Sequence, residues 1–207
     1  MKKLILKTTA ITLASIILVT SITFGIFVLF FPASLAKMFK SLGGESVAIY
    51  YYEKQYEKTD DINDLYTLCI ESFNNKDYER AELYFTILIQ KEGFNRICVI
   101  KDAERNNSVI STKEICHGAL ARATYETKGL DRALSVSRAL INAYGYSEYS
   151  PYLFLLENYG KKFIKVQLED IERFIQQSLE EITDSAQKVF AEQDLAKVEQ
   201  LLNALNG

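Results

Sequence analysis

A long uncharged stretch near the N-terminus limits how this chain can fold. No charged residue lies between Thr8 and Ala36, and residues 11–31 are almost entirely apolar. A helix of about 20 apolar residues spans a bilayer, whereas the apolar part of a cleaved signal peptide runs only about 7–15 residues. We therefore expect an uncleaved transmembrane helix over residues 8–31, in contact with the lipid bilayer. A cleaved signal peptide is the alternative, because residues 34–37 offer small side chains suited to a cleavage site.

Positive charges flank this stretch and indicate its orientation. Three lysines and the amino terminus precede it and two lysines follow it: Lys2, Lys3, Lys7, Lys37 and Lys40. The flank richer in Lys and Arg tends to stay in the cytoplasm. The sequence thus predicts a single-pass protein of the cell membrane, with a cytoplasmic N-terminus over residues 1–7 and an extracytoplasmic C-terminal domain.

The remaining composition favours helices. The 207 residues include only 9 glycines and 2 prolines, which argues against sandwiches and low-complexity linkers. The net charge is −3 with both signs interspersed, so the basic stripe that binds nucleic acid is absent from the sequence. We expect an all-α protein that does not bind nucleic acid. Frequent Lys, Ile, Asn and Tyr are typical of low-GC Gram-positive bacteria, which suggests a bacterial source.

A helix–turn–helix pattern lies in the middle of the chain. Residues 65–93 read as two helices joined by a tight turn at residues 75–77. The first helix carries Leu68 followed by a small residue, and the second carries the small Ala81 with the aromatic Phe85 four residues later. Two helices approach closely only where a small side chain meets a large one. We therefore expect Ala81 to face a partner helix.

Two further copies keep the same register. Ala48 and Ala133 take the place of Ala81, with Tyr52 or Ser137 four residues later. A leucine followed by alanine stands at the position of Leu68 in each copy: Leu35-Ala36 and Leu120-Ala121. An insert of about 18 residues, over residues 93–111, accounts for the longer distance between the second and third copies. We expect this insert to loop out of the stack.

These residues resemble the tetratricopeptide repeat (TPR), a helix–turn–helix of about 34 residues. The resemblance covers residues 32–146 and implies a short α-solenoid of about three helix pairs, since one pair cannot bury its apolar face alone. Gly93 stands where a terminating proline is usual, although glycine also ends helices. An unrelated bundle of helical hairpins is the alternative.

Residues 147–207 read as further helices. Ser150-Pro151 is a helix start, and apolar residues from Ile164 to Ile182 recur every three or four positions, as in an amphipathic helix. Thr183-Asp184 offers a break before a last helix. We expect these helices to cap the open end of the stack, and a short dimerising coiled coil is the alternative.

No residue pattern points to catalysis. The sequence lacks a glycine-rich phosphate loop, HExxH and GxSxG, and the single His117 falls at a packing position. The cysteines Cys69, Cys98 and Cys116 lack CxxC spacing. We therefore expect a protein that is not an enzyme, with no catalytic residue, cofactor or metal site. Cys98 and Cys116 could bridge outside the cytoplasm or remain free thiols.

The TPR resemblance also implies a binding surface. In such proteins the first helix of each repeat lines a concave face that holds a peptide segment of a partner. Carried over by register, the candidate partner-binding residues are Tyr66, Ile70, Phe73, Asn74, Arg122 and Tyr125. Aromatic and arginine side chains suit such a groove; alternatively, the C-terminal helices fill it.

The expected function is therefore a membrane-anchored scaffold for protein–protein interaction. It would present a TPR-like helical domain to another protein on the extracytoplasmic face of a bacterial membrane. An accessory or regulatory subunit of a membrane enzyme or transport complex is the alternative.

Overall fold

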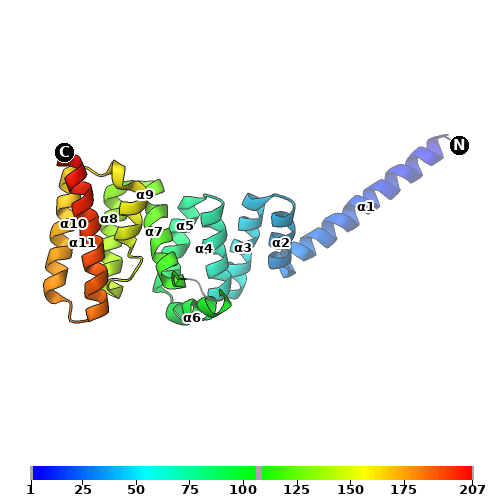
Figure 1. Cartoon of the computed structure of the whole chain (residues 1–207). Coiled ribbons are helices and arrows are strands. Elements are labelled where there is room, and N and C mark those ends of the chain that lie inside the picture. The colour runs from blue at the N-terminus through cyan, green and yellow to red at the C-terminus, as the bar shows by residue number, and fades with distance from the viewer. Residues whose placement is uncertain (1, 106–108, 207) are drawn as a thin grey trace. The chain divides into compact units, whose positions relative to one another are not determined.

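A computed structural model describes residues 2–105 and 109–206 (Figure 1), and within these ranges the chain is helical without any strand. The all-α expectation is confirmed. The chain divides into two compact units, residues 1–71 and 72–207. The boundaries expected at residues 31/32 and 146/147 fall between helices, but the division between the units falls inside α4, Ile62–Asn74.

The first unit begins with α1, Lys2–Phe30, which is apolar along almost its whole length. In the part of the chain that the structure describes, Thr8–Phe30 is the one helical segment long and apolar enough to cross a membrane. The rest of the protein buries none of its most apolar 18-residue stretch. The expectation of an N-terminal apolar helix of this length is confirmed.

Only Phe31 separates α1 from α2, Pro32–Ser41. Pro32 occupies the first turn of α2, where its missing N–H is not needed. The last carbonyls of α1 lack partners within the helix. The side chain of Lys58 reaches two of them, with Nζ at 3.4 Å from the oxygen of Leu29 and 3.2 Å from that of Phe30. A cation at this end also complements the helix dipole.

The helices α2 and α3, Glu45–Thr59, pack against each other. The residues that the repeat register assigns to close packing are all buried here: Leu35, Ala36, Ala48 and Tyr52. The rings of Phe39 and Tyr51 stack with their centroids 5.4 Å apart. An ion pair of 2.6 Å between Lys40 and Glu71 ties α2 to α4.

The turn after α4 lies where the sequence places it, between Asn74 and Tyr78. Lys76 adopts a positive φ of 60°, and Asp77 caps the next helix by accepting a hydrogen bond from the backbone N–H of Arg80. This next helix is α5, Tyr78–Gln90. In it Ala81 and Phe85 are fully buried, as the packing pattern requires.

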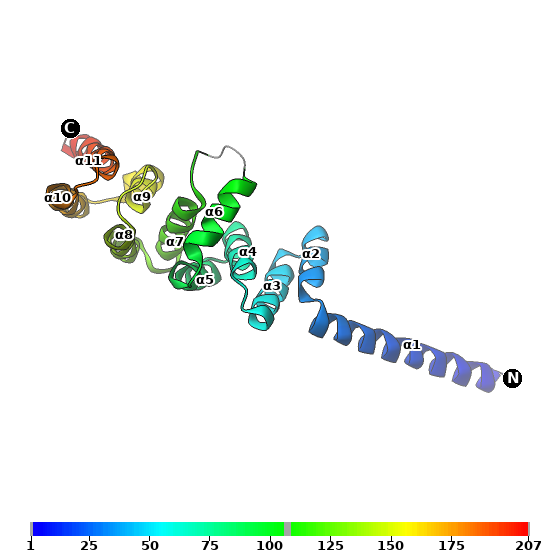
Figure 2. The same cartoon turned by 90° about the horizontal axis from the view of Figure 1, so that it is seen from below.

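The second unit continues with α6 (Phe94–Glu104), α7 (Thr112–Lys128) and α8 (Leu130–Tyr144). Helix α5 packs directly against α7, and α7 against α8. The insert at residues 93–111 was expected to loop out, but most of it forms α6, which packs against α5 and α7 (Figure 2). The reason is that Phe94, Ile97 and Cys98 recur every three or four residues and are buried together on one side of α6.

Two glycines bound α8. Gly129 has φ 82° and ψ 179°, and Gly145 has φ 80° and ψ −179°. This region of backbone conformation is open almost only to glycine. Each glycine ends the helix before it. The N–H of Gly129 donates to the carbonyl of Tyr125, and the N–H of Gly145 donates to the carbonyl of Ile141. These two reversals let α7, α8 and the following segment pack side by side.

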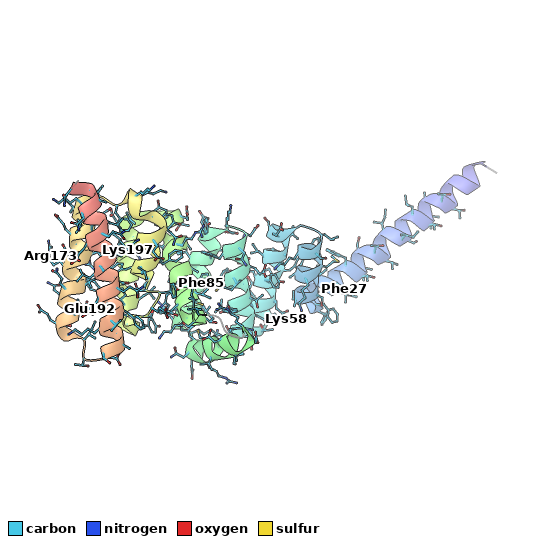
Figure 3. The ribbon with its side chains drawn as sticks, in the orientation of Figure 1. Phe27, Lys58, Phe85, Arg173, Glu192 and Lys197 are labelled. Atoms are coloured by element: carbon cyan, nitrogen blue, oxygen red, sulfur yellow. The ribbon has the colours of Figure 1, made fainter. Side chains whose placement is uncertain are left out.

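The C-terminal helices are α9 (Pro151–Tyr159), a short 3₁₀ turn η1 (Gly160–Lys162), α10 (Lys165–Glu181) and α11 (Ser185–Asn206). The expected starts are confirmed: the Ser150 hydroxyl accepts from the N–H of Leu153, and Asp184 accepts from the N–H of Gln187. Figure 3 shows Phe85 among the packed helices and Arg173 on the outside of α10.

The core of the second unit joins the C-terminal helices to α7 and α8. Its buried members come from α7 to α11 and the segments between them: Ala121, Ala133, Ile141, Tyr146, Tyr152, Leu155, Leu156, Phe163, Leu168, Ile171, Ile175, Ala191, Val198 and Leu202. The apolar stripe of α10 therefore packs within the chain against α11 and α9. It is not left open for the dimerising coiled coil that the sequence also allowed.

Candidate partner-binding surface

Of the six candidate residues, Phe73, Asn74, Arg122 and Tyr125 belong to the second unit, while Tyr66 and Ile70 belong to the first. Phe73 and Asn74 end α4, and Arg122 and Tyr125 lie on α7 one turn apart. Asn74 is exposed and the other three are half-buried. Tyr66 and Ile70 are half-buried on α4.

The structure brings Phe73 and Arg122 together. The guanidinium carbon of Arg122 lies 5.5 Å from the ring centroid of Phe73 and 5.9 Å from that of Tyr78. Its Nη2 donates to the Tyr78 hydroxyl at 3.4 Å, and the two rings meet edge to face at 5.9 Å. A cation held against two aromatic rings is stabilised by their negative faces. Arg122 is thus fixed in position, yet its buried Nε has no hydrogen-bond partner.

Tyr125 continues this surface toward α9. Its ring stacks on that of Tyr159 with centroids 4.0 Å apart. Lys162 donates from Nζ to the Tyr125 hydroxyl at 2.8 Å and lies 5.1 Å from the centre of the same ring. The Tyr159 hydroxyl donates to Oε1 of Glu126 at 3.0 Å. We call the set Phe73, Tyr78, Arg122, Tyr125, Tyr159 and Lys162 the aromatic–cationic cluster.

The protonation states of the cluster follow from these contacts. Burial and the hydrogen bond to Glu126 raise the pKa of Tyr159 to about 12, so its hydroxyl remains a donor at neutral pH. The hydrogen bond to Tyr125 raises the pKa of Lys162, which keeps its ammonium charged. The cluster therefore presents two cations and several flat rings, a combination suited to carboxylates and aromatic or planar groups of a partner.

Sequence reasoning found three members of the cluster and missed Tyr78, Tyr159 and Lys162. Tyr78 begins α5, whereas Tyr159 and Lys162 lie at the end of α9 and in the turn beyond it. They meet α7 only through the fold, at separations of more than thirty residues along the chain. No periodic pattern connects these positions, and only their aromatic or basic side chains could have drawn attention to them.

The other titratable groups singled out in the sequence have structural surroundings. His117 is buried between the rings of Phe94 and Tyr144, with centroids 6.1 Å and 4.9 Å away. Burial, helped by the nearby Lys113, lowers the pKa of His117 to about 4. All three cysteines are free and buried. Within the described residues, no three His, Cys, Asp or Glu side chains gather closely enough to hold a metal ion.

A concave feature lies between α8 and α10. It is an open cleft of about 420 Å³ whose lining includes Leu134, Arg138, Val166 and Asp170. Arg138 spans its wall, since Nη2 bonds to Oδ2 of Asp170 at 2.7 Å and Nε to the Tyr152 hydroxyl at 3.3 Å. Here the arginine is already paired with a carboxylate, so this cleft offers less to an acidic partner than the aromatic–cationic cluster does.

The chain shows no match to any known family model, curated protein or solved structure when compared with each.

Proposed function

We propose that this protein is a membrane-anchored scaffold that holds another protein through a TPR-like helical domain, on the extracytoplasmic face of a bacterial membrane. Three features support the proposal. The helix α1 is long, apolar and unburied. The small residues that the TPR register assigns to close packing are buried: Ala36, Cys69, Ala121, Ala48, Ala81 and Ala133. The third feature is the aromatic–cationic cluster.

The cluster is the observation that carries the proposal. Rings and cations from α4, α5, α7, α9 and η1 converge on one surface of the second unit. Aromatic residues and arginine contribute most to the binding energy of protein interfaces. Arg122 and Lys162 place two cations against the rings of this surface, which suits a carboxylate of the partner. The partner we propose is therefore an acidic peptide segment of another protein.

The first experiment removes the two aromatic anchors. The full chain and its Phe73→Ala/Tyr125→Ala variant are expressed with an affinity tag and captured from a detergent extract, and the co-purifying proteins are identified. Truncating hot-spot aromatics costs about 2 kcal/mol or more in binding, so the variant should lose the main partner while helix content and membrane insertion are retained.

The control is Tyr50→Ala. Tyr50 is an exposed tyrosine on α3 whose ring also lies beneath a lysine, Lys54, at 5.7 Å. This variant should capture the same proteins as the wild type. If the double variant also does so, the cluster is not the binding surface, and the α8–α10 cleft becomes the next surface to test.

The second experiment reverses the charge of Arg122. Arg122→Glu should weaken binding of an acidic segment and reduce its dependence on salt, because a complementary charge pair becomes a repulsive one. If Arg122→Glu weakens binding by the same factor at low and at high salt, the effect is not electrostatic, and Arg122 has a packing role.

Placement is tested separately with a thiol label. A cysteine replaces the exposed Asn203 in a chain whose three native cysteines are serine. Labelling by a membrane-impermeant reagent on intact cells is expected, and labelling only after lysis would place the domain in the cytoplasm. The scaffold proposal and the placement can thus fail independently.

The unburied α1 also favours a second candidate function, an accessory or regulatory subunit. An apolar helix without intramolecular cover can pack against membrane helices of an enzyme or transport complex. A partner that remains bound when Phe73 and Tyr125 are both alanine, but is lost when the sequence of α1 is replaced by polyleucine, would support this function over the scaffold.

A further inference from the structure

Cys98 and Cys116 lie in contact although they come from different helices. Cys98 is on α6 and Cys116 on α7, and their thiols are hydrogen-bonded to each other. Both side chains are buried, at 4% and 0% exposure. The third cysteine, Cys69, is also buried but belongs to the first unit. Two of the three thiols are thus held as a pair.

The backbone around the pair is fixed by a second contact between the same helices. Oδ1 of Asp102, in the last turn of α6, accepts hydrogen bonds from the backbone N–H and the hydroxyl of Thr112, both at 2.6 Å. Thr112 is the first residue of α7. This joint holds α6 and α7 at the spacing that lets the two thiols touch. An S–S bond is about 2 Å long, so the two sulfurs must move closer together than a hydrogen bond places them.

We propose that Cys98 and Cys116 form a disulfide on exposure to a small disulfide oxidant, and that this bond locks α6 onto α7. The bond would attach the insert helix covalently to the stack. Such bonds persist in oxidising compartments, which suits the extracytoplasmic placement proposed above. The reaction itself does not depend on that placement.

The exchange proceeds in two balanced steps. The Cys98 thiol loses its proton, and its sulfur attacks one sulfur of the oxidant, so that an S–S bond of a mixed disulfide forms and one small thiolate leaves. The Cys116 thiol then loses its proton and attacks the Cys98 sulfur, which releases the second small thiolate. The two cysteines lose two electrons in total, and the oxidant takes them up as two thiols.

Local surroundings favour ionisation of Cys98 over that of Cys69. The hydrogen bond from Cys116 lowers the pKa of the Cys98 thiol, whereas burial and the negative charge of Asp102 oppose this shift and the positive charge of Lys113 assists it. By contrast, burial raises the pKa of Cys69 well above its usual range, and no cysteine is hydrogen-bonded to it. Cys69 is therefore the internal control for a buried thiol that should not react.

The test counts thiols in the full chain purified in detergent. The folded protein is equilibrated with reduced or oxidised glutathione, then quenched in acid, unfolded and alkylated with a maleimide reagent that shifts its mobility on a gel. All three thiols should react after the reduced buffer, and only one, Cys69, after the oxidised buffer. Peptide mapping should find the fragment that joins Cys98 to Cys116.

Three single variants make the assignment specific. After the oxidised buffer, C69S should have no reactive thiol and C98S should retain its two remaining thiols. C116S should retain Cys69 as a thiol and carry a glutathione adduct on Cys98, because no second cysteine resolves the mixed disulfide. Three reactive thiols in the oxidised wild type would overturn the proposal, as would glutathione adducts without the internal linkage.

Hydrogen exchange tests the locking of α6 directly. Amides of α6 should exchange more slowly in the oxidised wild type than in the reduced wild type, because the bond suppresses local opening of the helix. In C98S the two buffers should give the same exchange rates. Unchanged exchange in an oxidised chain that carries the bond would refute the locking.

Discussion

Two buried titratable groups of the second unit have opposite effects on stability between about pH 5 and pH 8, and we expect the variant Asp194→Asn to separate them. Asp194 is fully buried on α11. The Ser150 hydroxyl donates to its Oδ2, while Oδ1 has no partner. Burial raises the pKa of Asp194 to about 7, despite the Ser150 hydrogen bond. His117 is shifted the other way, with a pKa of about 4.

The signs follow from proton uptake. The unfolded chain has an Asp pKa of about 3.9, below the folded value, so the folded state gains protons at Asp194 as pH falls through about 7 and becomes more stable. For His117 the unfolded pKa of about 6.5 lies above the folded value, so stability is lost as pH falls from about 6.5 toward 4.

The magnitudes nearly cancel. From pH 8 to pH 5, Asp194 should add about 2.5 kcal/mol to the free energy of unfolding, and His117 should remove about 2 kcal/mol. The wild type should therefore change by less than about 1 kcal/mol over this range. Asp194→Asn cannot take up the proton, so its stability should fall by about 2 kcal/mol between the same two pH values.

The assay is urea unfolding of the full chain in nonionic detergent, followed by tyrosine fluorescence. Working above about pH 5 keeps Glu114 ionised, because hydrogen bonds from Ser111 and Tyr149 lower its pKa although burial opposes them. Glu192→Gln, an exposed position on α11, is the control and should change stability by less than about 0.5 kcal/mol. Equal pH dependence in the wild type and Asp194→Asn would refute the assignment.

Three further changes test the packing and the turns. Ala81→Leu should overpack the fully buried side of α5 and lower the free energy of unfolding by about 1–3 kcal/mol; an unchanged unfolding curve would mean that the repeat register is wrong. Gly129→Ala meets no atom within 4 Å of the added Cβ, so urea unfolding should report backbone strain alone, about 1–3 kcal/mol. Ser150→Ala removes both the cap of α9 and the donor to Asp194, and should cost about 1–2 kcal/mol in the same assay at neutral pH, whereas a cost near zero would show that the cap is dispensable.

The sequence predicted the helices because their signals are local. Apolar residues recur every three or four positions, Ser150 and Asp184 cap helices as expected, and the short turn before Tyr78 lies where small and polar residues gather. The stack of TPR-like repeats stays a prediction, because buried small residues such as Ala81 occur in any tight helix pair.

What sequence reasoning could not supply depends on distant parts of the chain. The insert helix α6 was missed because it has few apolar residues, Phe94 and Ile97 among them. These are recognised as core residues only once α6 is seen to pack against α5 and α7. Tyr159 and Lys162 join the cluster only because α9 packs against α7. The buried Asp194 was missed for a similar reason, since its partner Ser150 lies 44 residues away.

The junction between α1 and α2 has a consequence for rotation. One residue, Phe31, links the two helices, and Lys58 of α3 bonds to the last carbonyls of α1. The azimuth of α1 about its own axis is thereby set relative to α2 and α3. Each added residue turns a helix by about 100° and lengthens it by about 1.5 Å. One alanine inserted before Phe31 would therefore rotate the rest of α1 by about 100° relative to α2. About seven inserted residues would restore the original azimuth and leave α1 longer.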